Sequence, residues 1–348
     1  MRRLPRTLAH IFLTAVFAMG STKVLAQTNL PSQTWQTATP LPVALQEIYP
    51  SVFMDRIFVG GGFSVSELET FHGLGPTDKV YLLNPSEEGW ELAPSLPDAR
   101  HHVGFASNIH YLYAIGGFNG PKGAAWQPQS SVYRLDGRVE RWVSAPSLPS
   151  PLAESVYATI GMNIHVIGGK TRAHDSDKNS DSTAHYVLKN NAYWSRAKPL
   201  PSPRNSAASV VIGDDIYVIG GRVSGDEPKN LDTVEVYNSK SDSWRTLAPL
   251  PVAAAGLAAS VINGKIVVTG GEAFDYQSEQ REGKVYASAW LYDPKLDAWR
   301  SLPDMPSPRH GHGQVSHNGL VYVIGGATKI GPQETLKSTI AFKLTDTN

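Results

Sequence analysis

The most informative absence from this 348-residue sequence is that of cysteine. Without cysteine the chain has no disulfide, no thiolate metal ligand and no cysteine nucleophile. An excess of charge is absent too, because 31 Lys and Arg residues balance 31 Asp and Glu residues. Nucleic acids and acidic membranes attract a basic surface, so we expect neither as a partner.

Long apolar runs and sustained helical periodicity are also missing. No run approaches the roughly 20 apolar residues that a membrane-spanning helix needs, so we expect no span in the mature chain. No segment repeats its apolar residues with a sustained period of 3.6, so we expect almost no helix. Hydrophobic residues make up 41% of the chain and charged residues 18%, which is typical of a globular protein.

The first 26 residues have the pattern of a secretory signal peptide. Arg2, Arg3 and Arg6 precede a short apolar run over residues 8–19, and a small-residue cleavage site ends at Ala26. We therefore expect cleavage after Ala26 and a periplasmic or secreted protein, with an uncleaved N-terminal anchor as the alternative. Cleavage leaves 27 basic and 31 acidic residues, a net charge of −4.

Six repeats organise the rest of the chain, each marked by a tryptophan, a proline and a pair of glycines. The tryptophans recur 50 to 55 residues apart, at Trp35, Trp90, Trp142, Trp194, Trp244 and Trp299. A proline lies seven residues after each tryptophan, at Pro42, Pro97, Pro149, Pro201, Pro251 and Pro306. A glycine pair begins 19 residues after each proline, at Gly61, Gly116, Gly168, Gly220, Gly270 and Gly325. Intervals this constant exclude coincidence.

Each repeat has the pattern of four β-strands. Two strand-like runs between the proline and the glycine pair are joined by turns such as Asn263-Gly264, which are typical of β-hairpins. A third strand follows a loop of variable length, and a fourth begins at the tryptophan. Four antiparallel strands every 50 to 55 residues predict the blade of a β-propeller. We expect an all-β, six-bladed β-propeller that forms a single domain over residues 27–348.

The glycine pair with its spaced Tyr and Trp residues resembles the kelch repeat, over residues 35 to 344. The glycines let the backbones of neighbouring blades approach, and the aromatic rings fill the wedge between blades. Trp35 has no glycine pair before it, and Gly325-Gly326 has no tryptophan after it. We therefore expect the N-terminal strand to complete the last blade, which leaves no open sheet edge.

The loops after the glycine pairs mark one face of the predicted propeller. They run for about 12 to 17 residues, longer than ordinary hairpin loops, and binding residues concentrate on such loops. The proline-rich connections between blades open on the same face. We expect the functional site there.

Reading across the repeats at equal distance from the proline gives the candidate residues. Three residues on, the series is Leu45, Arg100, Leu152, Arg204, Ala254 and Arg309. Four residues on, it is Gln46, His101, Ala153, Asn205, Ala255 and His310. Five residues on, it is Glu47, His102, Glu154, Ser206, Gly256 and Gly311.

We predict that Glu47, His102 and Glu154 carry acid/base chemistry, because two carboxylates flank a histidine on consecutive blades. The arginines on alternate blades suit a carboxylate, with Arg204 facing Glu47 and Arg309 facing Glu154 across the axis. Structural ties between blades are the alternative role for these arginines. The predicted ligand contacts are Arg100, His101, Arg204, Asn205, Arg309, His310, His312, Arg222, Glu272 and Trp126.

We expect no metal and no cofactor. His310 and His312, two apart on one predicted strand, lack a matched third ligand. Galactose oxidase also has kelch blades, but its copper site needs a cysteine, which this chain lacks.

Two functions stay open. The first is binding of a small polar or carbohydrate ligand, with or without a carboxylate, or of a protein partner. The second is suggested by a resemblance in fold, compartment and residue types to the periplasmic sialic-acid mutarotases, which are exported six-bladed kelch propellers. That resemblance implies a cofactor-free sugar mutarotase or epimerase that uses a Glu/His acid/base pair and an arginine clamp.

Overall fold

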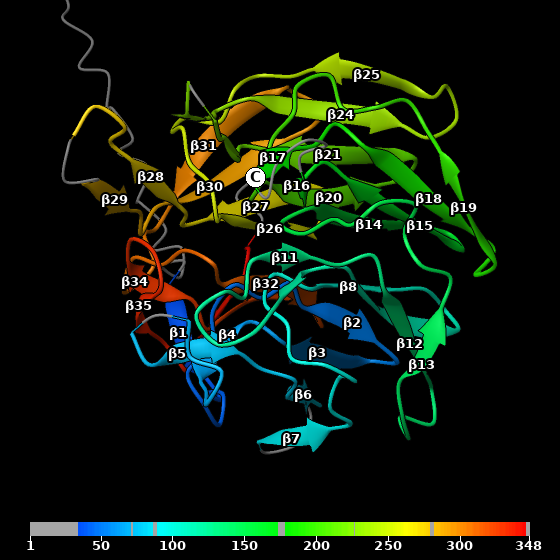
Figure 1. Ribbon diagram of the computed structural model, residues 1–348. Helices are drawn as coiled ribbons and strands as arrows, with labels where there is room; N and C mark the ends of the chain where they lie inside the picture. The colour runs from blue at the N-terminus through cyan, green and yellow to red at the C-terminus, as the bar shows by residue number, and fades with distance from the viewer. Residues whose placement is uncertain are drawn as a thin grey trace, which may run out of the picture. The chain divides into compact units, whose positions relative to one another are not determined.

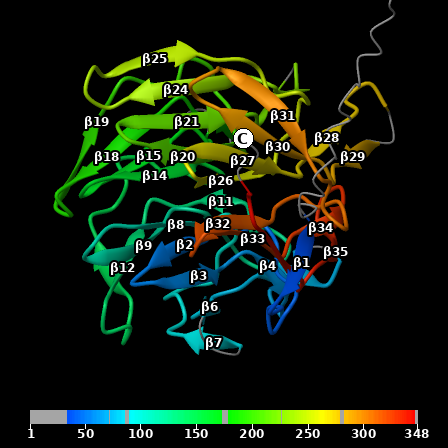
Figure 2. The same cartoon turned by 180° about the vertical axis from the view of Figure 1, so that it is seen from behind.

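The computed structural model describes residues 34–70, 72–85, 89–172, 178–225, 227–278 and 282–345. The described strands all belong to one compact unit, Gln33–Asn348. They form six four-stranded antiparallel sheets arranged in a ring, and no helix occurs among them (Figures 1 and 2). The predicted six-bladed β-propeller is confirmed. The predicted signal peptide lies outside the described residues.

Each blade is a meander of four strands that runs from the innermost strand to the outermost. Blade 1 is β2 (Ser51–Phe53), β3 (Arg56–Gly60), β6 (Val80–Leu83) and β7 (Trp90–Ala93). Blade 2 is β8 (Gly104–Ser107), β9 (Tyr111–Ile115), β12 (Val132–Asp136) and β13 (Val143–Ala145). Blade 3 is β14 (Val156–Ile160), β15 (Asn163–Ile167), β18 (His185–Lys189) and β19 (Tyr193–Arg196).

The other three blades repeat this order. Blade 4 is β20 (Ala208–Ile212), β21 (Asp215–Ile219), β24 (Val234–Asn238) and β25 (Ser243–Thr246). Blade 5 is β26 (Ala258–Ile262), β27 (Lys265–Thr269), β30 (Ala289–Asp293) and β31 (Ala298–Leu302). Blade 6 is β32 (Gly313–His317), β33 (Leu320–Ile324), β36 (Thr339–Phe342) and β1 (Trp35–Ala38).

The loops after the glycine pairs are short hairpins, a feature that the sequence pattern did not predict. The hairpins are β4 (Phe63–Val65) with β5 (Leu74–Pro76), β10 (Phe118–Asn119) with β11 (Gln127–Pro128), and β16 (Lys170–Arg172) with β17 (Asn179–Asp181). The other three are β22 (Arg222–Val223) with β23 (Lys229–Asn230), β28 (Glu272–Phe274) with β29 (Gly283–Val285), and β34 (Ala327–Lys329) with β35 (Gln333–Thr335). Each hairpin extends its blade on the face where the site was expected.

The core lies between the blades. The second strand of every blade is nearly continuous in apolar residues, as in β21, because both of its faces pack against neighbouring blades. The innermost strand of each blade contacts those of its neighbours, and β2 against β32 closes the circle. Six apolar clusters result.

The glycine pairs join each blade to the next. The second glycine of each pair donates its N–H to a carbonyl of the following blade at 2.8 to 2.9 Å. The pairs are Gly62 with Arg100, Gly117 with Leu152, Gly169 with Arg204, Gly221 with Ala254, Gly271 with Arg309, and Gly326 with Leu45. At Gly116 (φ 57°) a Cβ would overlap the Leu152 carbonyl oxygen, so a side chain there would separate the blades.

The six repeat tryptophans form a second set of bonds between blades. Each indole Nε1–H donates to a carbonyl just beyond the outermost strand of the preceding blade, at 2.7 to 3.0 Å. The pairs are Trp35 with Pro303, Trp90 with Thr39, Trp142 with Pro94, Trp194 with Pro146, Trp244 with Lys198, and Trp299 with Ala248. Tryptophan therefore supplies both packing area and a directional contact.

The N-terminal strand completes the last blade, as predicted. Along β1, Trp35 pairs with Phe342 of β36, and their rings lie 4.9 Å apart. The indole of Trp35 also bonds to Pro303, in the same way as the other five tryptophans. Within the described residues, no helix is long and apolar enough to cross a membrane.

Replacing Trp35 by Ala is expected to lower the free energy of unfolding by about 3 kcal/mol, because it removes ring packing and the indole bond that close the propeller. Urea unfolding of the two proteins measures the loss. Leu92→Ala, on the outermost strand of blade 1 and 65% exposed, is the control and should cost about 0.5 kcal/mol or less. Equal losses in the two variants would contradict closure through Trp35.

Candidate functional site

Six equivalent residues surround the propeller axis where the blades begin. They lie five residues after the repeat prolines, and all have a left-handed backbone with φ between 52° and 62°. They are Glu47, His102, Glu154, Ser206, Gly256 and Gly311. Backbone bonds link successive members, such as His102 N–H to the Glu47 carbonyl at 3.2 Å and Gly256 N–H to the Ser206 carbonyl at 2.9 Å.

This backbone conformation is costly for residues with a side chain. It disfavours a residue with a Cβ by roughly 1 kcal/mol, and such strain gathers at functional sites. Two blades carry glycine at this position, so glycine is compatible with the fold. Glu47, His102 and Glu154 therefore occupy strained positions where glycine fits, which supports a functional role for their side chains.

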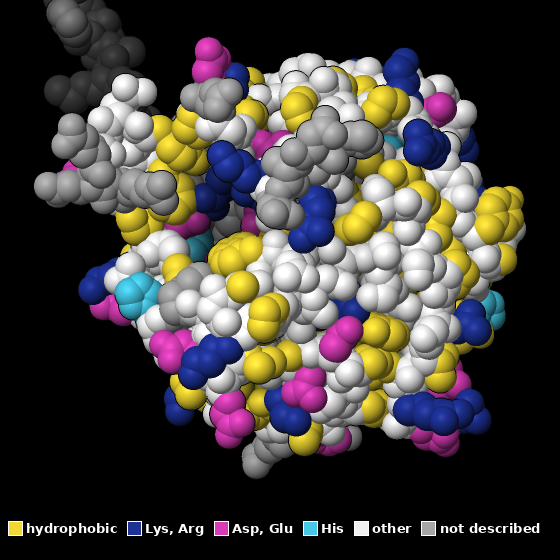
Figure 3. Space-filling model, in the orientation of Figure 1, with side chains coloured by type: hydrophobic (Ala, Val, Ile, Leu, Met, Phe, Trp, Pro, Cys, Tyr) yellow, Lys and Arg dark blue, Asp and Glu magenta, His cyan; other side chains and the backbone are white. Residues whose placement is uncertain are grey.

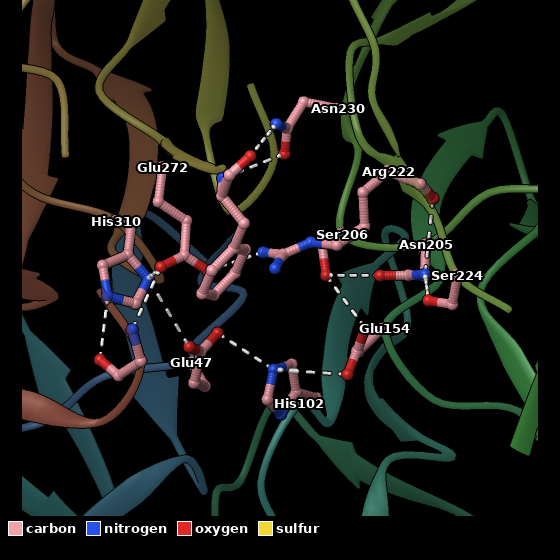
Figure 4. A network of polar contacts seen from close by, with 12 residues as sticks. Glu47, His102, Glu154, Asn205, Ser206, Arg222, Ser224, Asn230, Glu272 and His310 are labelled. Carbon is pink, nitrogen blue, oxygen red and sulfur yellow. Dashed lines mark hydrogen bonds and ion pairs between the residues drawn. The ribbon is translucent and has the colours of Figure 1, made fainter. Parts of the chain in front are cut away.

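His102 lies between the two carboxylates. Its Nε2 is 3.0 Å from Glu47 Oε2 and 3.8 Å from Glu154 Oε1. Ser206 donates a hydrogen bond of 2.9 Å to the other oxygen of Glu154. Figure 4 shows these side chains converging on one space, and His102 and Glu154 are both buried. The structure places Glu47, His102 and Glu154 side by side, and their acid/base role stays a prediction.

The hydrogen bonds of His101 indicate where the protons of His102 lie. His101 Nε2 is 2.6 Å from the Ala125 carbonyl, which can only accept, so Nε2 carries a hydrogen. In a neutral imidazole His101 Nδ1 is then an acceptor, and His102 Nδ1, 2.6 Å away, must donate to it. With Glu47 ionised, His102 Nε2 must also donate, so His102 is a cation held between two carboxylates.

The electrostatics of the site agree with this assignment. Burial would raise the pKa of Glu47, but the charge and hydrogen bond of His102, with the charge of His310 when it is protonated and that of Arg222, lower it to about 2. Burial would lower the pKa of His102, but Glu47 and Glu154 outweigh burial and raise it. Burial and the neighbouring His102 hold the pKa of His101 well below its ordinary value.

A second ion pair lies beside the first. Arg222 NH2 is 2.6 Å from Glu272 Oε1, and Glu272 Oε2 accepts the Gly331 N–H at 3.1 Å. His310 Nδ1 lies 3.6 Å from Glu272 Oε2 and 3.7 Å from Glu47 Oε1. We call these residues the mouth cluster: Glu47, His102, Glu154, Ser206, Arg222, Glu272 and His310.

The hairpins position Arg222 and Glu272. Each is the residue directly after a glycine pair, where every blade forms a bridge to the residue four positions after its proline. The bridged pairs are Phe63 with Gln46, Phe118 with His101, Lys170 with Ala153, Arg222 with Asn205, Glu272 with Ala255, and Ala327 with His310. Reading across the repeats from the glycine pairs would have identified this second ring of side chains.

The three alternating arginines lie apart from the mouth cluster, contrary to the predicted facing pairs. Arg100, Arg204 and Arg309 are each 1% exposed and bond to carbonyl groups of their own blade. Arg204 also pairs with Glu235. Their position in the chain points each guanidinium back into its own blade, so they hold the strands of one blade together, whereas the alternative role predicted for them was a tie between adjacent blades. Arg222 approaches Glu47 and Glu154 instead.

His310 and His312 do not share one face of a strand, which corrects the sequence interpretation. β32 begins only at Gly313, and the left-handed Gly311 between the histidines turns them apart. His310 lies in the mouth cluster, whereas His312 Nε2 contacts Thr269 Oγ1 at 2.8 Å between blades 5 and 6. Among the described residues, no three His, Asp or Glu side chains are grouped as a metal ion requires.

Two further predicted contacts lie at the edge of the cluster. Asn205 Oδ1 lies 3.0 Å from the Ser206 hydroxyl, whose one hydrogen it shares with Glu154, and Asn205 donates a hydrogen bond to Ser224. Trp126 is 38% exposed and packs against His101 and Phe118. Figure 3 shows a hollow on this face where basic, acidic and histidine side chains lie beside apolar ones.

Hairpin β28–β29 makes an aromatic contribution that the sequence pattern did not predict. The Arg222 guanidinium lies 4.9 Å from the ring centre of Phe274. A cavity of about 90 Å³ continues along the axis and is lined in part by Glu47, Tyr49 and Tyr157. Glu47 and Ser206 of the cluster also line this cavity, whose other walls are mostly apolar, so the cluster lies at the mouth of a narrow channel.

The comparisons with known proteins agree with the fold and the repeats. Residues 153–348 match the KLHDC2/KLHL20/DRC7 Kelch-repeats domain, and residues 99–149 match the Kelch motif. This six-bladed propeller belongs to the kelch-repeat family.

Its relatives are distant. Kelch-like protein terF of Aspergillus terreus is 27% identical over 317 residues, which cover 88% of this chain and 67% of the relative. Kelch-like protein 23 of Homo sapiens is 24% identical over 293 residues, 81% of this chain but only 46% of the relative. A solved structure titled "Structure of YjhT" matches with a TM-score of 0.73 and 18% identity, over 89% of this chain and 97% of that one. It shares the fold.

The charge pair between His102 and Glu47 gives a pH-dependent contribution to stability. The part due to the raised pKa of His102 is complete below about pH 6.5 and is lost as pH rises through the raised value. The part due to Glu47 is complete above about pH 4.5 and is lost as pH falls toward 2. The pair therefore stabilises most between these limits.

We expect His102→Gln to cost about 3 kcal/mol between these limits, because it leaves buried carboxylates without their cation. The cost should shrink as pH rises above the pKa of His102. Urea unfolding between pH 5 and 9 measures it, with the exposed His110→Gln as control. A cost for His102→Gln that is constant over this range would contradict a charged His102.

Proposed function

We propose that the protein binds a small polyhydroxyl ligand, a saccharide, in the mouth cluster. The observation that carries the proposal is the strained ring position, where Glu47, His102 and Glu154 place charged side chains at the opening of the channel. Structural stability alone does not call for ionisable groups where glycine fits.

The cluster offers the contacts that a sugar needs. Carboxylate oxygens of Glu47 and Glu154 and the Ser206 hydroxyl oxygen accept hydrogen bonds from hydroxyl groups, and Arg222 donates them. Trp126, at the edge of the hollow, offers an aromatic face for the apolar side of a sugar ring. A ligand carboxylate would have to compete with Glu272 for Arg222, because the other three predicted arginines bond within their blades.

Sugar mutarotation is the second candidate, favoured by the charged His102 between two carboxylates. In this reaction a base takes the proton of the anomeric hydroxyl while an acid protonates the ring oxygen, the ring C–O bond breaks, and reclosure reverses these steps. His102 is the acid in this scheme. Glu154 is the better base, because the low pKa of Glu47 makes that carboxylate a weak one.

We also propose that the protein acts outside the cytoplasm, on the basis of the signal-peptide pattern in residues 1–26. A protein partner on the same face is the competing proposal, supported by the kelch-repeat relatives. Ligand binding is favoured because the charged groups converge on a channel mouth rather than spread over an exposed surface.

Residues 27–348 should bind monosaccharides, and Glu154→Gln should weaken the binding at least 10-fold, which corresponds to about 1.4 kcal/mol. Calorimetry with a panel of neutral, acidic and amino monosaccharides measures the affinity. Glu91→Gln, an exposed acid on β7, is the control for the loss of one negative charge. A panel without any binding sugar would refute the proposal, as would binding that Glu154→Gln leaves unchanged.

The same panel tests catalysis. NMR of freshly dissolved anomers should show faster equilibration with the wild type and not with His102→Gln if the protein is a mutarotase. Binding without any acceleration would reject the enzyme and retain the binding protein.

Two glycines allow a matched test of the position of Glu47. A Cβ at Gly311 would lie 2.8 Å from the Glu47 carboxylate, whereas one at Gly256 meets only ordinary contacts, and the two φ angles are similar (57° and 62°). Both alanine variants should lose about 1 kcal/mol of stability to backbone strain. Only Gly311→Ala should displace Glu47, lowering the His102 pKa in an NMR titration and weakening sugar binding. Identical His102 pKa values in the two variants would contradict this.

A further inference from the structure

One corner of the mouth cluster contains more hydrogen-bond acceptors than donors. His310 is 1% exposed, and its Nδ1 has no hydrogen-bond partner among the described residues, while Glu272 Oε2 accepts only the Gly331 N–H there. Two carboxylate oxygens lie near Nδ1, Glu47 Oε1 at 3.7 Å and Glu272 Oε2 at 3.6 Å, and both are beyond hydrogen-bond distance. Figure 4 shows His310 directed at these two carboxylates.

The other ring nitrogen of His310 determines what Nδ1 offers. His310 Nε2 lies 2.8 Å from the Lys329 carbonyl and 3.0 Å from the Gly331 carbonyl, and carbonyl oxygens only accept. Nε2 therefore carries the hydrogen, and in the neutral imidazole Nδ1 presents a lone pair. This lone pair and two carboxylate oxygens form a set of three acceptors.

Each carboxylate gives its other oxygen to a cation of the protein. Glu47 Oε2 contacts His102 at 3.0 Å, and Glu272 Oε1 contacts Arg222 at 2.6 Å. The oxygens that face His310 are therefore the ones not used by these ion pairs. With His310 neutral, the three carboxylates of Glu47, Glu154 and Glu272 outnumber the two cations His102 and Arg222, which leaves a charge that attracts one more cation.

We propose that Glu47 Oε1, Glu272 Oε2 and His310 Nδ1 form a subsite for the primary ammonium group of an amino sugar. An ammonium group supplies three donors, one for each of these acceptors, whereas a hydroxyl supplies only one. Donor–acceptor distances near 2.8 Å around a tetrahedral nitrogen place its acceptors roughly 4.6 Å apart, so the two carboxylate oxygens, 3.7 and 3.6 Å from His310 Nδ1, have to move outward by about 1 Å when the ammonium group binds. The rest of the mouth cluster, with Glu154 and Ser206, binds the hydroxyl groups.

This inference rests on the proposed function, because it names the class of saccharide that the mouth cluster binds. It also reverses the charge expected for the ligand. The alternating arginines had suggested a carboxylate-bearing ligand, but their side chains are committed within the blades, and the charges that remain at the mouth favour a cation.

The test compares glucosamine, N-acetylglucosamine and glucose, which share a ring and differ at one substituent. Calorimetry with residues 27–348 at about pH 7, still below the pKa near 7.7 of such an amine, should give at least 10-fold tighter binding of glucosamine. Glu272→Gln should remove this preference. The control is Glu282→Gln, because Glu282 is an exposed acid in the β28–β29 hairpin that also contains Glu272. This variant removes the same charge and should keep the preference for glucosamine.

A second measurement does not depend on a variant that folds. Imidazole nitrogen NMR of the wild type should show that glucosamine shifts the Nδ1 signal of His310 and leaves that of Nε2 almost unchanged. A shift of both signals or of neither would overturn the subsite.

The remaining outcomes separate the inference from the proposed function. Equal binding of the three sugars, or binding of only the neutral two, overturns the ammonium subsite and retains a saccharide site. Failure of all three sugars and of the wider monosaccharide panel overturns both. A Zn²⁺ titration that perturbs His310 Nδ1 where glucosamine does not would assign the corner to a metal and overturn the inference.

Discussion

The structure depends on one backbone contact that is repeated around the ring. The second glycine of each pair donates its N–H to a carbonyl three residues after the proline of the next blade, at 2.8 to 2.9 Å in all six cases. A Cβ on the first glycine would meet that carbonyl of the next blade, and a Cβ on the second would meet the backbone of its own blade, so the contact requires glycine at both positions. Because the same contact anchors every blade-to-blade connection, the residue two positions further on reaches the axis in the same left-handed conformation in every blade.

That constraint explains why the functional residues gather at the mouth of the channel. The fold sets the position and the backbone of six residues but not their side chains, and glycine satisfies the position in blades 5 and 6. Glu47, His102 and Glu154 occupy it at a cost of roughly 1 kcal/mol each, and their charges then depend on one another. Removing the cation would leave buried carboxylates unpaired, so the cluster is a single electrostatic unit.

The repeat intervals were sufficient to predict the fold, because each repeat of the sequence forms one blade. They also predicted closure by the strand that begins at Trp35, because that tryptophan has no glycine pair before it. They also predicted that Glu47, His102 and Glu154 lie together, since equivalent positions of neighbouring blades meet at the axis. The same logic failed for Arg100, Arg204 and Arg309. Equivalent positions fix the backbone, but the direction of a long side chain depends on local carbonyl groups that intervals do not reveal.

The sequence by itself determined the number of blades, their order, the closure of the ring and the ring of residues at the axis, because these follow from spacing along the chain. Only the tertiary structure decided which charges meet. Arg222 and Glu272 come from hairpins 50 residues apart and pair because their blades are adjacent. His310 turns toward them and His312 away, because Gly311 between them is left-handed. Side-chain direction is set by contacts between blades, and these contacts exist only once the ring has closed.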